Sequence, residues 1–167
     1  MTALLLKRLR EHLAQALASL KLLGQSPDGD VTTAPKVFIG DVPPKRMVKE
    51  SSVYEVPCVV IVPVSGHLLV ANGAAASETV IAICCCVYNP DKGERADLEE
   101  VEAELAALLS AVTGALLPCA QGTPLAKRFD LVPDEKGRML DWVRAEDQPK
   151  PFSGATITSR WWFKGWE

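Results

Sequence analysis

The sequence predicts one α+β domain, a mainly antiparallel, mixed β-sheet with two main α-helices packed against it. Three observations predict this fold class. The chain has 167 residues, enough for a single domain with its own core. Its composition, 48% hydrophobic and 23% charged, is that of a globular protein. Helical and strand-like patterns follow one another in the order helix, strands, helix, strands, and no repeat divides residues 1–167 into smaller units.

The first expected element is an N-terminal helix within residues 1–24, with its periodic part from Leu4 to Leu23. Charged side chains lie opposite an apolar stripe along this stretch. The stripe consists of Leu6, Leu9, Leu13, Leu17 and Leu20. Gly24 is expected to end the helix, because glycine readily adopts the left-handed conformation of a helix C-terminus.

A turn-rich stretch from Gln25 to Ala34 separates that helix from the first strand. Lys36 to Gly40 is expected to be a short strand, closed by glycine and the following prolines. Residues 41–55 are expected to form an exposed arm. The sheet therefore begins at residue 36.

A Val- and Ile-rich strand is expected from Val56 to Val64, and residues 68–70 can continue it. Pro57 and Pro63 lack backbone N–H donors, which places the ends of this strand at an edge or a bulge. The small residues 72–77 are suited to the tip of a hairpin leading into the next strand.

The central strand is predicted from Thr79 to Tyr88, because the residues on both of its faces are apolar. We therefore expect it to be buried on both sides. A turn at Asn89 to Gly93 follows, and Asp97 with Glu100 forms a capping pattern for a helix over residues 97–114. The apolar stripe of this second helix consists of Leu98, Val101, Leu105, Leu108, Leu109 and Val112.

Two further strands are expected at Phe129 to Val132 and Met139 to Ala145, flanking a turn at residues 133–137. Their arrangement predicts a β-hairpin. The last strand is expected from Ala155 to Phe163. The sheet and the second helix together then occupy residues 36–163.

Charge and hydropathy disfavour several classes of partner. The formal net charge is −3 and the 18 Lys and Arg are scattered, so no basic stripe for nucleic acid is expected. The longest uninterrupted apolar stretches are far shorter than the roughly 20 residues that cross a bilayer, and the N-terminal charges do not match a secretory signal. Five cysteines, an odd number without framework spacing, favour reduced thiols in a cytoplasm.

Two short motifs are candidate sites for chemistry. The run Cys84-Cys85-Cys86 lacks a metal-binding spacing such as C-x-x-C, and its apolar flanks favour core thiols. Ser65-Gly66-His67 could place a nucleophile beside a base, but neighbours on a strand rarely meet and the G-x-S-x-G pattern is absent. His67 and His12 are both expected at the surface.

The acidic residues around the second helix favour a solvated helix face over a cation site. They are Glu94, Asp97, Glu99, Glu100, Glu102 and Glu104. No glycine-rich phosphate motif occurs. We therefore expect no catalytic, cofactor or metal site, and a chain that is not an enzyme.

Tryptophan is concentrated near the C-terminus, and its four copies are candidate subunit-interface residues. They are Trp142, Trp161, Trp162 and Trp166. Adjacent strand residues point to opposite faces, so of Trp161 and Trp162 one can enter the core. An outward ring is either covered by the N-terminal helix or bound to another subunit, where Trp is a favoured anchor.

The C-terminal pattern resembles tail terminator, or tail completion, proteins of long-tailed bacteriophages and prophages. The resemblance rests on Arg138 to Pro149, on Pro151-Phe152 and on the strand ending Arg160-Trp161-Trp162. The strand Val80 to Tyr88 and the turn after it fit the same layout. The resemblance covers roughly residues 36–163.

This resemblance implies a structural virion-assembly role without a cofactor. Such proteins form a homo-oligomeric ring, usually a hexamer, that caps the tail tube and presents a surface to the head-connector protein. The implied location is the host bacterial cytoplasm during assembly and then the virion tail. One alternative is a head-to-tail joining (neck) protein. From another class, the alternative is a small ligand-binding or enzymatic domain with a dispersed site.

Overall fold

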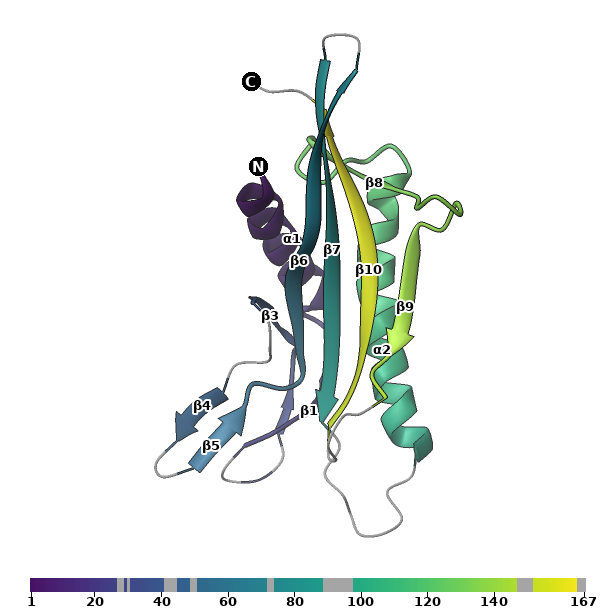
Figure 1. The fold of residues 1–167 in the computed structure, drawn as a ribbon. Helices are drawn as coiled ribbons and strands as arrows, with labels where there is room; N and C mark the ends of the chain where they lie inside the picture. The colour runs from purple at the N-terminus through teal and green to yellow at the C-terminus, as the bar shows by residue number, and fades with distance from the viewer. Residues whose placement is uncertain are drawn as a thin grey trace.

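A mixed β-sheet forms the middle of the molecule, and two helices pack on one of its faces (Figure 1). The computed structural model describes residues 1–26, 29, 31–40, 45–48, 51–71, 74–88, 98–146 and 152–164. All sheet pairings except one are antiparallel. The expected fold class, α+β with two main helices on a mainly antiparallel sheet, is confirmed.

The central sheet has the strand order β3-β6-β7-β10-β8, with β9 also paired to β10. Its strands are β3 (Lys36–Ile39), β6 (Cys58–Ala71), β7 (Ala74–Tyr88), β8 (Phe129–Val132), β9 (Leu140–Arg144) and β10 (Phe152–Lys164). β3 runs parallel to β6. Two small antiparallel pairs lie outside this sheet: β1 (Leu22–Gly24) with β2 (Val31–Thr33), and β4 (Lys45–Val48) with β5 (Ser51–Tyr54).

The central strand β7 separates two unequal faces of the sheet. Alternate residues on one face are fully buried under the helices, and we call this the helix-covered face. Its β7 members are Ile81, Ile83, Cys85 and Val87. The opposite face, here the open face, has the half-buried β7 members Val80, Ala82, Cys84 and Cys86. Of the residues expected on this second face, only Tyr88 is buried, so the expectation of burial on both sides is wrong for the other four, because both helices pack on the same face.

The N-terminal helix α1 (Thr2–Leu17) buries four of the five leucines of the expected stripe, but it is shorter than predicted, so Leu20 lies beyond its end and is half-buried. Its buried side chains are Leu5, Leu6, Leu9, Leu13 and Leu17. Gly24 does not end the helix; it pairs with Val31 in the small sheet. An added Cβ at Gly24 would lie 2.9 Å from Thr33 Cγ2, so close packing between β1 and β2 explains the glycine.

The second helix α2 (Leu98–Leu116) passes through Gly114 and continues into the short 3₁₀ helix η1 (Leu117–Ala120). Leu105, Leu108 and Val112 are buried and Leu109 packs against the same core, which confirms these members of the predicted stripe. The side chains of the other two members, Leu98 and Val101, lie outside the described residues. So do the Asp97 cap and the turn at Asn89 to Gly93.

One stretch of this region, Glu102–Ala120, is long and apolar enough to cross a membrane by length and composition. Polar residues interrupt this stretch, so the length of its uninterrupted apolar runs did not indicate it. In the structure this stretch contributes Leu105, Leu108, Val112 and Leu116 to the core. The core helix of a globular domain meets the same criterion.

β6 confirms the predicted Val- and Ile-rich strand, but it begins at Cys58 instead of Val56 and extends to Ala71. The register with β7 shifts between Pro63 and Ser65, so Pro63 lies at a bulge, as its missing donor predicted. β3 pairs only with Cys58–Ile61, and β6 and β7 extend beyond both helices (Figure 1). Of the expected hairpin tip, Ala74–Ser77 belong to β7, and residues 72 and 73 lie outside the described residues.

The strands β8 and β9 occur where they were predicted, but they do not form a hairpin. Both pair with β10, and their ends meet there, because Val132 lies opposite Arg160 and Leu140 lies opposite Ser159. They form one edge strand interrupted by residues 133–139. Within this interruption, Asp134 Oδ1 accepts backbone hydrogen bonds from Lys136 and Arg138.

The segment expected as an exposed arm contains the β4–β5 pair, which projects from the body in Figure 1. At its end Val53 is buried, and the Tyr54 ring meets Phe152 edge-on at 5.1 Å between centroids. The base of the arm is therefore attached to the start of β10.

Candidate functional site

The main polar cluster on the open face surrounds Glu78 of β7. In the sheet register Glu78 lies opposite Trp162 on β10 and opposite His67 on β6. Because directly paired residues share a face, these side chains lie side by side. Arg160, two residues before Trp162, joins them from the same face of β10. We call Glu78, His67, Arg160 and Trp162 the Glu78 cluster.

Both carboxylate oxygens of Glu78 accept hydrogen bonds. Arg160 Nη1 donates to Oε1, and Trp162 Nε1 donates to Oε2 at 2.9 Å. His67 Nε2 lies 3.5 Å from Oε1. The Glu78 side chain is only 9% exposed, so its charge depends on these partners.

Opposing effects set the pKa of Glu78. Burial raises it, but the hydrogen bonds from Trp162 and Arg160, with the positive charge of Arg160, together leave the pKa below its ordinary value. A carboxyl group with a lowered pKa is a weak base. Glu78 is therefore suited to hold Arg160 and Trp162 in place, and poorly suited to accept a proton in catalysis.

A hollow of about 520 Å³ lies over the Glu78 cluster. Besides the cluster, residues 132–135 line it, at the start of the interruption between β8 and β9. The hollow thus combines an indole ring, a guanidinium group and carboxylates. Such a surface can accept a side chain of a partner protein or a small polar ligand.

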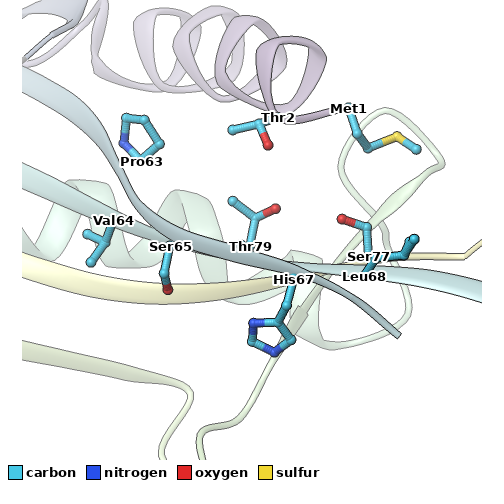
Figure 2. Close-up of a pocket in the computed structure, with 10 residues that line it drawn as sticks. Met1, Thr2, Pro63, Val64, Ser65, His67, Leu68, Ser77 and Thr79 are labelled. Carbon is cyan, nitrogen blue, oxygen red and sulfur yellow. The ribbon is translucent and has the colours of Figure 1, made fainter. Parts of the chain in front are cut away.

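A second hollow, of about 460 Å³, lies between the start of α1 and the β6–β7 hairpin (Figure 2). Thr2 faces Pro63 and Thr79 across it, and Met1 lies near Leu68 and Ser77. Ser65 and His67 point to the other side of the sheet. The hollow is lined mainly by small and apolar side chains, so it offers few groups that could bind a polar ligand or take part in a reaction.

The structure does not bring Ser65 and His67 into a nucleophile–base arrangement. Both are on the open face, but among the described residues no hydrogen bond joins them, and His67 approaches Glu78 instead. His67 is exposed as predicted. His12 differs from the prediction, because it is half-buried and its Nε2 lies 2.8 Å from the carbonyl oxygen of Ala115, linking α1 to α2.

The cysteine run is divided between the two faces. Cys85 is fully buried on the helix-covered face, whereas Cys84 and Cys86 are half-buried on the open face. Cys58 lies directly opposite Cys86 in the β6–β7 register. This pair could not be predicted from the sequence, because only the long-range register brings residues 58 and 86 together.

The candidate tryptophans occupy different environments. Trp161 is 1% exposed and its Nε1 donates to Ser159 Oγ at 2.9 Å, so its ring belongs to the core and is unavailable to a partner. Trp162 faces the open side, which confirms the opposite orientation of the two rings. Trp142 is 59% exposed on β9. Trp166 lies outside the described residues.

The acidic side of α2 forms an ion pair with the edge of the sheet. Glu102 Oε1 lies 2.6 Å from Arg144 Nη2 of β9. Glu94 and Asp97, and the side chains of Glu99 and Glu100, lie outside the described residues. Within the described part of the chain, no group of three or more His, Cys, Asp or Glu side chains has a metal-binding arrangement.

Comparison of the chain with protein-family models and with curated protein sequences finds no match. The residues themselves must therefore carry the functional argument.

Proposed function

We propose that the chain is a structural subunit that binds further copies of itself head-to-tail in a closed ring, and that this ring caps a phage tail tube. The observation that carries the proposal is the placement of exposed apolar side chains at two opposite edges of one sheet. These edges are the β6 strand of the β6–β7 hairpin and strand β9, and β7 and β10 lie between them.

The first edge is the part of β6 that continues beyond β3. Residues 62–71 have no described partner strand on that side, and they include no Asp, Glu, Lys or Arg. Val64, Leu68 and Val70 are 61%, 54% and 71% exposed. A long, uncharged edge strand with exposed apolar residues is what folded proteins avoid unless it is covered by a partner.

The second edge is β9, which pairs only with β10 among the described strands. Trp142 and its neighbour Val143, which is 65% exposed, lie on opposite faces of this edge. Trp is enriched at the centres of protein interfaces. This strand also lies within the segment, Arg138 to Pro149, that resembles tail terminator proteins.

Two different surfaces on one subunit favour a heterologous contact. The hairpin of one copy then binds β9 of the next, and such contacts either close into a ring or extend as a filament. The resemblance supports the ring, usually a hexamer, with the tail tube protein and the head-connector protein as further partners. In this proposal the Glu78 cluster and its hollow are a surface for a protein partner.

The mass of the purified protein in solution tests self-assembly. Light scattering over a concentration series should give one discrete oligomer, and negative-stain images should show rings. A ring that closes only on its target would instead appear at the ends of polymerised tail tubes mixed with the protein. Protein that forms no closed oligomer and does not bind tubes would contradict the proposal and favour a ligand-binding domain.

A further inference from the structure

Two cysteines on the open face are placed for direct reaction with each other. Cys58 begins β6 and lies directly opposite Cys86 on β7, so the two side chains share one face of the sheet. Directly opposed residues of antiparallel strands have Cα atoms about 4.5–5.5 Å apart, within the range of about 4.4–6.8 Å that a disulfide spans. A bond between them therefore requires no large movement of the backbone.

The other thiols are placed differently. Cys84 lies opposite Val60, and its Sγ accepts a hydrogen bond from Thr156 Oγ1 at 3.6 Å. Cys85 points into the core on the other face. The sheet register thus selects one pair from the five free cysteines.

The two thiols of the pair are unequal. Cys58 is fully buried, whereas Cys86 is half-buried. Interaction with the Cys58 thiol lowers the pKa of Cys86 against the effect of burial, and the same interaction, with burial, raises the pKa of Cys58. Because the thiolate is the nucleophile, Cys86 is suited to attack first and Cys58 to react second.

We propose that Cys58 and Cys86 are a redox-active dithiol that small disulfides, such as oxidised glutathione, convert into an intrachain disulfide between β6 and β7. The Cys86 thiolate attacks one glutathione sulfur and expels the other glutathione as a thiol. Cys58 then loses its proton to solvent and attacks Cys86 Sγ, and the second glutathione leaves as a thiolate that takes up a proton. The two protein thiols are oxidised, and one oxidised glutathione is reduced to two molecules of thiol.

The bond closes a loop that contains nearly all of the β6–β7 hairpin. A cross-link of this length restricts the unfolded chain, so the oxidised protein should have a Tm higher by roughly 10 °C. Reduction with dithiothreitol should reverse the shift. The site is independent of the proposed ring, because Cys58 and Cys86 lie at the end of the hairpin away from its tip.

Peptide mapping of the folded full chain tests the proposal. The protein is incubated with oxidised glutathione, alkylated under denaturing conditions and digested. The expected product joins Cys58 to Cys86, with Cys84, Cys85 and Cys119 alkylated. A bond from Cys86 to Cys84, bonds only between chains, or complete alkylation of Cys86 would each overturn it.

Single variants distinguish the roles of the two thiols. Cys58→Ser removes the second thiol, so Cys86 should retain glutathione as a mixed disulfide. Cys86→Ser should leave Cys58 unmodified. The matched control Cys84→Ser should form the same cross-link as the original protein. Loss of the cross-link in Cys84→Ser, with the fold intact by circular dichroism, would contradict the assignment.

Discussion

The two faces of the sheet differ in what their side chains do. On the helix-covered face, Ile83 and Ile157 pack with the leucines of α1 and α2 in one continuous apolar core. On the open face, a smaller apolar cluster around Cys58 and Tyr88 gives way to the Glu78 cluster and its hollow. Burial of apolar area is the main source of stability. The helix-covered face therefore contributes most of the stability, and the open face carries the polar contacts.

The adjacent tryptophans of β10 should show the largest difference between the faces. Trp161→Ala should lower the free energy of unfolding by about 3–5 kcal/mol, because a fully buried aromatic ring is removed. Trp162→Ala should cost less, about 1–3 kcal/mol, mainly through the hydrogen bond lost by Glu78. Urea denaturation measures both. Equal losses of free energy of unfolding would contradict the difference between the two faces.

A substitution in the second helix should cause the next largest loss of stability. Leu105→Ala should lower the free energy of unfolding by about 2–5 kcal/mol, since Leu105 is buried against the core. The control Ala107→Gln, on the exposed side of the same helix, should change it by less than about 0.5 kcal/mol. A Leu105→Ala loss as small as that of the control would place α2 outside the core.

The pH dependence of the free energy of unfolding tests the role of the Glu78 cluster on the open face. Because the folded-state pKa of Glu78 is lowered below 4.5, its stabilising contribution is present above pH 4.5 and is lost as pH falls through the folded-state pKa. Glu78→Gln should therefore be less stable at pH 7, by about 1–3 kcal/mol. The difference in free energy of unfolding between Glu78→Gln and the original protein should narrow as the pH falls below 4.5.

Denaturation curves at a series of pH values measure that gap. Glu135→Gln, at the rim of the same hollow, is the control and should change stability by less than about 0.5 kcal/mol. A Glu78→Gln gap that stays constant from pH 7 to about pH 3, below the ordinary carboxyl range, would show that the ionised carboxylate contributes nothing.

Local patterns in the sequence predicted most elements of the fold. Four of the five leucines expected in α1, the described members of the α2 stripe and the alternation in β10 depend on neighbouring residues, and they were located correctly. The end of α1 was not, because Leu22–Gly24 pair with β2 instead of continuing the helix. The β8–β9 hairpin was wrong for a related reason, since both strands pair with β10, which comes later in the chain.

The candidate sites depended still more on long-range register. Trp161 and Trp162 were correctly assigned to opposite faces, because that follows from the strand period alone. Neither the Glu78–Trp162 contact nor the Cys58–Cys86 pair could be predicted, because each joins residues from different strands. The apolar pattern of β7 could not show that both helices lie on one face.

The central claim is that the β6–β7 hairpin of one copy binds β9 of the next, and two complementary variants test it most directly. Leu68→Asp should disable only the hairpin surface, and Val143→Asp only the β9 surface. Both residues are exposed, so neither variant should unfold the protein. Each variant alone should be monomeric by light scattering, and an equimolar mixture at high concentration should give a dimer that grows no further. A mixture that remains monomeric under conditions where the original protein assembles, or either variant alone still assembling fully, would contradict the account.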